Sequence, residues 1–242
     1  MKNLQIIVEG SSEETFVNDV MVKHFAPLNI FISARKIRTG WDKINKKPAK
    51  GGLLKYIKFR NDVLRWIESD RGRANTFYTS FIDLYAFPKD AESPYTTKIQ
   101  NIPGHYQKIT ALEAAISLDI NHPNFIPYVQ LHEFEALVLV DPDRLITMYP
   151  DEQTGINKLK RAIGNMNPEE INESSQSAPS KRIIQYLPNY EGQKAQVGPL
   201  VAEDIGLTAL RNNCPHFNDW ITKLLRNNCP HFNDWITKLE NI

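Results

Sequence analysis

The run Leu4-Gln5-Ile6-Ile7-Val8-Glu9-Gly10-Ser11-Ser12-Glu13-Glu14 joins an apolar segment, a turn and a helix start. Residues 4–8 are typical of a buried strand, and the glycine and serines after Glu9 indicate a turn. Ser11 and Glu14 have the spacing of a capping box, and acidic side chains suit the positive end of a helix dipole. The run therefore predicts a strand, a turn and a helix, with Glu9 at the carboxyl end of the strand.

Strand and helix signals alternate through the next hundred residues. Strands are expected near residues 30–34, 76–82 and 125–131, with helical spacing of apolar residues between them. This order is typical of an α/β fold, so we expect a Rossmann-like, mainly parallel four-stranded sheet with flanking helices. Pro127 interrupts the last of these segments, which predicts an edge or bulged strand.

Strand signals disappear after Asp151, so we expect an α/β core over residues 1–150 and a C-terminal helical appendage over 151–242. The appendage contains a perfect tandem repeat, because the segment LRNNCPHFNDWITKL occupies residues 210–224 and again 225–239. Solenoid repeats are rarely identical, and three or more are usually needed for stability. A single groove on the core accepts one copy, so the duplication is expected to add nothing to the chemistry.

Composition limits the class of protein. The 242 residues carry 29 Lys and Arg against 28 Asp and Glu, so nucleic-acid binding would require a local basic patch rather than overall charge. No apolar run approaches the roughly 18 residues of a membrane span, and the first residues lack the apolar region of a signal peptide. The two cysteines both lie in the repeat, which excludes a disulfide framework. A cytoplasmic protein is expected.

Two acids follow predicted strands, Glu9 after the first and Asp83 after the third. If these strands are adjacent and parallel, both side chains lie in one crevice at the carboxyl edge of the sheet. Paired carboxylates hold Mg²⁺ together with water and phosphate oxygens, and such an ion activates water for phosphodiester hydrolysis. Taken singly, either acid is more often a turn former or a helix-dipole charge; their joint placement makes the two interpretations equal.

A third group of candidates is His132, Glu133 and Glu135. In a helix over residues 132–139, His132 and Glu135 would share a face, whereas in a strand Glu133 and Glu135 would. The helix is favoured because good helix formers follow Glu135. Acids beside apolar neighbours need a cation as partner. A single histidine in such a place is more often structural than a metal ligand.

Basic residues gather after the second predicted strand. A phosphate backbone could be held there, although a solvated loop explains the pattern equally well. The candidates are Arg35, Lys36, Arg38, Lys43, Lys46, Lys47 and Lys50, with Asp42 as the one acid between them. Lys181 and Lys194 are further candidates for a cation near the acids.

Several runs resemble a bacterial family of unknown function, domain-of-unknown-function family 4276. They are Ile7-Val8-Glu9-Gly10-Ser11-Ser12-Glu13, Phe81-Ile82-Asp83-Leu84-Tyr85, Gln130-Leu131-His132-Glu133-Phe134-Glu135-Ala136-Leu137, Ser177-Ala178-Pro179-Ser180-Lys181-Arg182 and Cys229-Pro230-His231-Phe232. The resemblance covers nearly the whole chain apart from one repeat copy, and the run around His132 is its most specific part. The strand ending in Glu9, with an acid after the third strand, also resembles the Toprim fold of topoisomerases, primases and overcoming-lysogenization-defect nucleases.

The resemblance implies roles for named residues. Glu9 would be a metal ligand or general base, Asp83 would hold Mg²⁺ or Mn²⁺, and Glu133 or Glu135 would supply a further carboxylate, with Glu13 and His132 in support. It also implies an AAA- or ABC-type ATPase as partner and a part in defence against phage.

Tyr85 departs from the Toprim pattern, which has Asp-x-Asp after the third strand. Three functions are therefore weighed. The first is a metal-dependent nuclease in which Glu9 and Asp83 hold the ion and Lys181 or Lys194 neutralises the phosphate. The second is a non-catalytic scaffold or sensor subunit of an ATPase complex. The third, weaker, is a hydrolase of a small nucleotide.

Overall fold

The computed structural model describes residues 2–37, 41–42, 47–48, 53, 55–71, 73, 75–85, 87–171 and 177–228. The strands are β1 (Lys2–Val8), β2 (Ile30–Lys36), β3 (Trp41–Asp42), β4 (Lys47–Pro48), β5 (Thr76–Asp83), β6 (Phe125–Ile126) and β7 (Val129–Gln130). The α-helices are α1 (Ser11–Phe16), α2 (Val22–Phe25), α3 (Tyr56–Ser69), α4 (Thr97–Gln100), α5 (His105–Ile120), α6 (Glu135–Val138), α7 (Gln153–Ile163), α8 (Pro179–Tyr186), α9 (Lys194–Ile205), α10 (Leu207–Asn213) and α11 (Pro215–Asn228). A π-helical turn, η1 (Val17–Met21), joins α1 to α2, and 3₁₀ segments cover Ala26–Leu28, Pro142–Thr147, Pro168–Glu170 and Pro188–Tyr190.

The main sheet is parallel, which confirms the predicted α/β class. Its order is β2-β1-β5-β6, and β7 pairs with the carboxyl half of β5. The fourth predicted strand is split into β6 and β7, because Pro127 between them has no backbone N–H to donate. Its position at the edge of the sheet agrees with the expectation from that proline.

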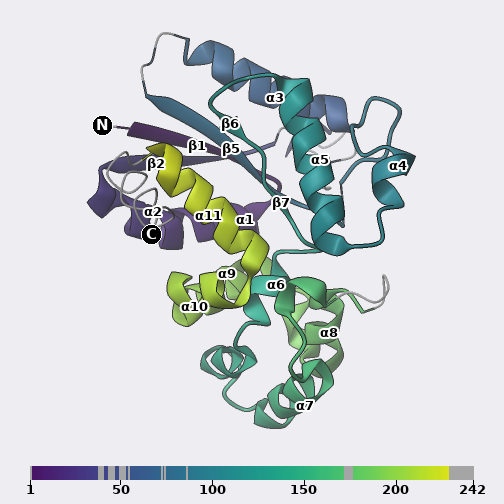
Figure 1. Cartoon of the computed structure of the whole chain (residues 1–242). Coiled ribbons are helices and arrows are strands. Elements are labelled where there is room, and N and C mark those ends of the chain that lie inside the picture. The colour runs from purple at the N-terminus through teal and green to yellow at the C-terminus, as the bar shows by residue number, and fades with distance from the viewer. Residues whose placement is uncertain are drawn as a thin grey trace, which may run out of the picture.

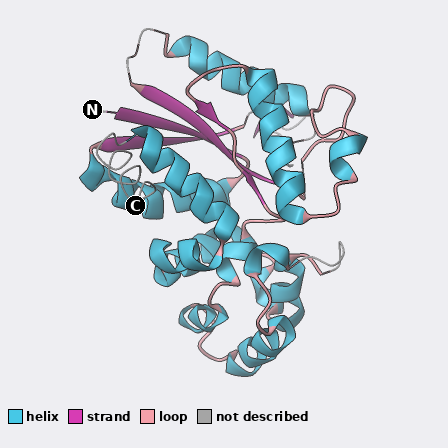
Figure 2. Cartoon of the chain, in the orientation of Figure 1, coloured by secondary structure: helices cyan, strands magenta, loops and turns pink. Residues whose placement is uncertain are grey.

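Helices cover both faces of the sheet (Figure 1). Side chains alternate along β1, so Leu4, Ile6 and Val8 belong to one buried cluster and Ile7 to another. The first cluster lies under α1, α2 and α11, and the second under α3 and α5. Figure 2 shows the strands between these two helical layers.

The helix after β1 begins as predicted, but a different pair caps it. The Glu13 carboxylate accepts a hydrogen bond from the backbone N–H of Gly10 at 2.8 Å, so the capping residues are Gly10 and Glu13 rather than Ser11 and Glu14. This hydrogen bond turns the Glu13 carboxylate back toward the end of β1, where Glu9 lies.

Helices α6 to α10 gather below the sheet in the view of Figure 1. Helix α9 packs against α1, and one apolar cluster extends from β1 through these helices to α11. The division at residue 150 remains a prediction. No helix in the described ranges is long and apolar enough to cross a bilayer.

The first copy of the repeat packs against β5 and against Tyr128, the residue before β7. Trp220 stacks on Tyr128, with ring centroids 4.2 Å apart and planes 9° from parallel. Its indole N–H donates to the Thr79 hydroxyl at 2.9 Å. Phe217, Ile221 and Leu224 are fully buried around it. Beyond residue 228 the second copy lies outside the described residues.

The start of α11 is held by a buried carboxylate. Glu169 is inaccessible to solvent and accepts hydrogen bonds from the backbone N–H groups of His216 and Phe217, both at 2.9 Å. The Tyr106 hydroxyl donates to the same carboxylate at 3.2 Å. These bonds satisfy N–H groups that have no partner within the helix itself.

We expect Glu169→Ala to lower the free energy of unfolding by about 3 kcal/mol, because it leaves buried donors without an acceptor. Glu170→Ala is the matched control, since Glu170 is exposed and its replacement is expected to change the free energy by less than about 0.5 kcal/mol. Urea denaturation of both variants measures the difference. Equal effects would show that the carboxylate is not what holds α11.

Candidate functional site

The carboxyl ends of β1 and β5 bring Glu9 and Asp83 together. The two strands are adjacent and parallel, with Val8 beside Phe81. Oε2 of Glu9 accepts a hydrogen bond from the backbone N–H of Asp83 at 3.2 Å, and the backbone N–H of Glu9 donates to Phe81 at the same distance. Acids 74 residues apart in the chain therefore meet at one edge of the sheet, as the spacing of strands and acids predicts.

Further carboxylates surround this pair. Glu13 comes from the first turn of α1 and Glu135 is the first residue of α6; they are only 4% and 7% exposed. The carboxyl group of Asp83 lies within electrostatic range of four acids, which are Glu13, Glu9, Glu135 and Glu133. Five acidic side chains thus share one region of low dielectric constant.

Burial raises the pKa values of Glu9, Glu13, Asp83 and Glu135, and for the last three repulsion by neighbouring acids adds to the rise. Burial raises the pKa of Glu13 to about 7, with a further contribution from the charge of Glu9. The pKa of Glu135 also rises to about 7, through burial and the charge of Glu133, although Lys194 opposes the rise. Burial, followed by the neighbouring acids, raises the pKa of Asp83 well above its ordinary value, and burial raises the pKa of Glu9. Near neutral pH the group holds protons that a bound cation would displace.

The donor set suits a hard divalent cation. Oδ1 of Asp83 is sealed from solvent and accepts no hydrogen bond from any described residue. Such an orphaned oxygen is costly unless it has a partner, and carboxylate oxygens are the ligands that Mg²⁺ and Mn²⁺ prefer. The types of side chain present therefore suit Mg²⁺ or Mn²⁺, the ions that the resemblance to the Toprim fold implies.

The described side chains do not form a closed cage. Within the ranges that the structure describes, no three His, Cys, Asp or Glu side chains converge closely enough to hold a metal ion. Mg²⁺ does not require such a cage, since it usually keeps several waters and takes one or two protein carboxylates together with substrate phosphates. Glu9 and Asp83 are the pair that the backbone already brings together.

The segment from His132 to Glu135 differs from both interpretations of the sequence. Helix α6 begins only at Glu135, and His132 has a positive φ of 66°, so the predicted helix over 132–139 starts too early. Glu133 instead accepts a hydrogen bond from the backbone N–H of Ser180 at 2.9 Å, at the start of α8. His132 and Glu135 therefore do not share a helical face. The positions of Glu133 and Glu135 are set by contacts with Ser180 and Tyr190, which lie about 50 residues further along the chain, and not by helical periodicity.

His132 lies against the ring of His105, with centroids 5.2 Å apart. Burial, with the charges of His105 and Lys108, lowers the pKa of His132 to about 4, so its imidazole is neutral at physiological pH. This packing supports the structural interpretation of the histidine.

The two candidate lysines have different surroundings. Lys194 begins α9 and its charge acts on Glu135, so it lies beside the acidic group. Lys181 is exposed, and its ammonium lies 3.9 Å from the carboxylate of Glu191. Of the two, Lys194 is the one whose charge acts on an acid of the candidate site.

The basic segment is described only in part. Arg38, Lys43, Lys46 and Lys50 lie outside the described residues, as do residues 229–232, and of Lys47 only its place in β4 is given. The guanidinium of Arg35 lies 4.7 Å from the ring centre of Trp66. Lys36 forms an ion pair with Glu14 at 2.8 Å. Both described residues therefore contact neighbouring helices, and a role in binding nucleic acid remains a prediction.

Two residues near the acids were not expected from the sequence. Ser180 holds Glu133 through its backbone and has a buried hydroxyl with no partner among the described residues. The Tyr190 hydroxyl donates to Glu135 at 3.5 Å. Pro179 at the first position of α8 is a signal for a helix start that could receive a carboxylate. No comparable signal marks Tyr190.

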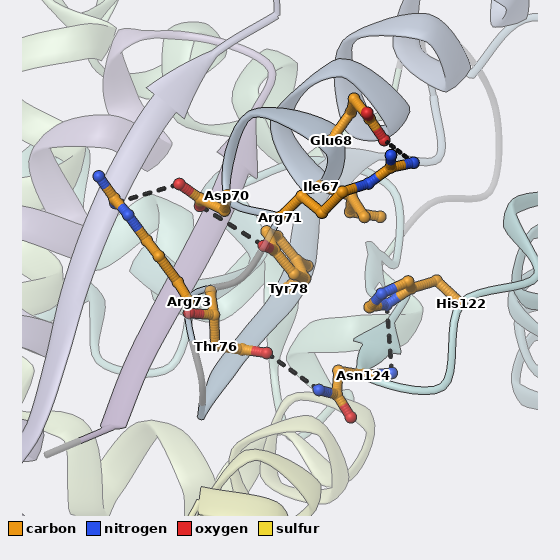
Figure 3. Close-up of a pocket in the computed structure, with 9 residues that line it drawn as sticks. All are labelled: Ile67, Glu68, Asp70, Arg71, Arg73, Thr76, Tyr78, His122 and Asn124. Atoms are coloured by element: carbon orange, nitrogen blue, oxygen red, sulfur yellow. Dashed lines mark hydrogen bonds and ion pairs between the residues drawn. The ribbon is translucent and has the colours of Figure 1, made fainter.

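A pocket of about 350 Å³ lies at the opposite end of β5 (Figure 3). Thr76 lines it, whereas Asp83 lies seven residues further along the strand, about 23 Å away at 3.3 Å per residue. The charged side chains that line this pocket form ion pairs with one another. Asp70 pairs with Arg73 at 3.0 Å, and Glu68 pairs with Arg71 at 2.7 Å. We therefore place the candidate site at the acidic edge.

Comparison with known proteins places the chain in one family. The model of a family described as a domain of unknown function (DUF4276) matches residues 8–225. No curated protein and no solved structure matches the chain. The matched range includes every acid of the candidate site.

The raised pKa values predict how stability depends on pH. An acid whose pKa rises from 4.5 to about 7 on folding binds its proton more tightly in the folded state, so the free energy of unfolding falls as the pH rises between these values. A single group with this shift contributes about 3 kcal/mol. We expect Glu135→Gln to reduce the loss of stability between pH 5 and pH 8, measured by urea denaturation.

Glu92→Gln is the control, because Glu92 is exposed and is not among the acids whose charges act on Glu13, Asp83 or Glu135. It should leave the pH dependence unchanged. A Glu135→Gln variant with the pH profile of the unmodified protein would contradict the raised pKa.

Proposed function

Since this chain belongs to the DUF4276 family, whose function is unknown, we propose from the site itself that the protein is a Mg²⁺- or Mn²⁺-dependent nuclease of Toprim type. The observation that carries the proposal is the meeting of Glu9 and Asp83 at the carboxyl edge of a parallel sheet, with an unpartnered oxygen on Asp83. Ligands of open α/β sheets bind at this edge. Buried acids with strongly shifted pKa values are also typical of functional sites.

In this proposal Glu9 and Asp83 hold the ion, and Glu133 or Glu135 is the further carboxylate. A bound ion would supply an activated water and stabilise the charge that develops on a phosphodiester. Glu135, with a pKa of about 7, can take up or release a proton near neutral pH. Lys194 supplies positive charge beside these acids for the phosphate. The basic segment after β2 would hold the nucleic-acid backbone.

The partner is proposed from the resemblance alone. An AAA- or ABC-type ATPase would switch the nuclease on, within a system of defence against phage. Co-expression of the ATPase encoded beside the protein, followed by co-purification, tests this part separately from cleavage.

A non-catalytic scaffold is the second candidate. Tyr85, 53% exposed, stands two residues after Asp83, where the Toprim pattern has a second aspartate. The described residues also form no group of three side chains that could hold a metal ion. Metal binding distinguishes the two candidates.

We expect a calorimetric titration with Mg²⁺ at pH 8 to show binding with a dissociation constant in the millimolar range or lower. Bound Mg²⁺ should also raise the melting temperature of the protein. Asp83→Asn should abolish both effects, because it removes the charge of the orphaned carboxylate. Asp151→Asn is the control, since Asp151 is exposed at the start of the α7 region. Tight binding of the ATPase by a protein that does not bind metal would instead support the scaffold.

Cleavage is the direct test of the enzyme. Purified protein with its ATPase partner should nick DNA or RNA in Mg²⁺ or Mn²⁺, and Glu9→Gln or Asp83→Asn should lower the rate at least about 100-fold while circular dichroism shows an intact fold. Glu92→Gln should retain the rate. Full cleavage by both site variants would disprove the assignment.

A further inference from the structure

Glu133 connects the acidic group to the start of helix α8. Its carboxylate accepts a hydrogen bond from the backbone N–H of Ser180, 47 residues further along the chain, at 2.9 Å. The charge of the same carboxylate acts on Asp83 and on Glu135. Helix α6, which begins at Glu135, also packs against α8. The start of α8 therefore lies next to the candidate site.

The first turn of α8 is suited to an anion. Pro179 is its first residue, and the N–H groups of a first helical turn have no acceptor within the helix. Together with the positive end of the helix dipole, such N–H groups bind phosphate and carboxylate groups. The acceptor at Ser180 is a carboxylate from a different segment of the chain. Glu133 is partly exposed, whereas Glu135 is buried, so a ligand from solvent can reach the hydrogen bond that Glu133 makes.

The hydroxyl of Ser180 is an independent sign of a missing ligand. Ser180 is 1% exposed, and its Oγ atom has no hydrogen-bond partner in the part of the chain that the structure describes. A buried hydroxyl in this condition lowers stability, so it calls for an explanation. The Glu133 carboxylate binds the N–H of Ser180 and leaves the hydroxyl unsatisfied. A phosphate has more oxygens than a carboxylate, so it can bind both groups of one serine.

Positive side chains on α8 and α9 suit the same ligand. Lys181 and Arg182 directly follow Ser180, and Nε of Arg182 donates to the carbonyl of Ser177 at 3.0 Å, which fixes the chain just before α8. Lys194 begins α9, and its charge acts on Glu135. These cations offset part of the repulsion between a phosphate and the neighbouring acids.

We propose that the start of α8 is a phosphate subsite, which Glu133 occupies until a phosphate of the substrate replaces it. The phosphate binds the N–H and the hydroxyl of Ser180, and the displaced Glu133 becomes available beside Asp83 and Glu135. While Glu133 is bound to α8, no three acids of the described residues converge on a metal ion, which agrees with this exchange. The inference rests on the proposed function in taking the phosphate to be that of a nucleic-acid backbone.

Binding of inorganic phosphate without metal tests the exchange. In EDTA at pH 8, calorimetry of the full-length Glu133→Ala variant should show binding at least about tenfold tighter than that of the unmodified chain, because the phosphate no longer competes with a carboxylate of the same molecule. Circular dichroism checks that the variant is folded. Phosphate affinity equal to that of the unmodified chain would overturn the proposal.

Glu135→Gln is the matched control for charge. It removes a carboxylate from the same acidic group, but Glu135 accepts its hydrogen bond from Tyr190 and not from α8. Its phosphate affinity should rise less than about threefold. An equal gain in Glu133→Ala and Glu135→Gln would show that only repulsion was relieved, and would reject the exchange at α8.

Ser180→Ala separates binding from folding. Added to Glu133→Ala, it should lower the phosphate affinity at least about tenfold. Urea denaturation should show a free energy of unfolding that is unchanged or higher than that of Glu133→Ala, because a buried hydroxyl without a partner has been removed. Unchanged phosphate affinity would show that the hydroxyl does not bind the ligand, and would contradict the subsite.

A DNA octanucleotide without a terminal phosphate distinguishes a backbone phosphate from free phosphate. It should show the same gain in Glu133→Ala and the same loss on addition of Ser180→Ala; effects limited to inorganic phosphate would overturn the assignment to nucleic acid. These measurements are made without metal, so the subsite and the nuclease can fail separately. Binding as expected without cleavage in Mg²⁺ or Mn²⁺ would reject the nuclease alone, whereas cleavage without a gain in Glu133→Ala would reject the subsite alone.

Discussion

The parallel pairing of β1 with β5 is the constraint on which the candidate site depends. Strand pairing alone sets the carboxyl ends of both strands at one edge, and the hydrogen bond from the Asp83 backbone to Glu9 joins the two acids directly. Glu13 and Glu135 enter the same region because α1 and α6 begin there. A change in strand order would separate the acids without altering any of them.

Buried carboxylates in this protein are of two kinds. Glu169 and Glu113 have hydrogen-bond partners, from the start of α11 and from His216 and Val129, so their burial serves the packing of the last helix. Asp83 has an oxygen without a described partner, and its neighbours repel it. A buried carboxylate oxygen without a hydrogen bond lowers the stability of the fold. Such an unfavourable group is expected at a functional site, so Asp83 is more informative about function than Glu169 or Glu113.

The region around the acids also carries backbone strain. His132 adopts a left-handed conformation, which is unfavourable for a side chain with a Cβ. Phe16, Phe81 and Phe134 form a buried aromatic cluster, with ring centroids 5.6 to 6.1 Å apart, and Phe134 lies between Glu133 and Glu135 in the chain. Burial of these rings is a stabilising contribution next to acids whose repulsion and burial are unfavourable.

The spacing of apolar residues and the position of Pro127 by themselves determined the α/β class, a mainly parallel sheet and the edge position of the last strand, because these depend on local patterns of a few residues. The strand order and the division of the last strand into β6 and β7 came only from the tertiary structure. The spacing of apolar residues also placed Glu9 and Asp83 at strand ends. The surroundings of Glu133, the partner Tyr190 and the turn at His132 depend on contacts between segments about 50 residues apart, which no local pattern encodes.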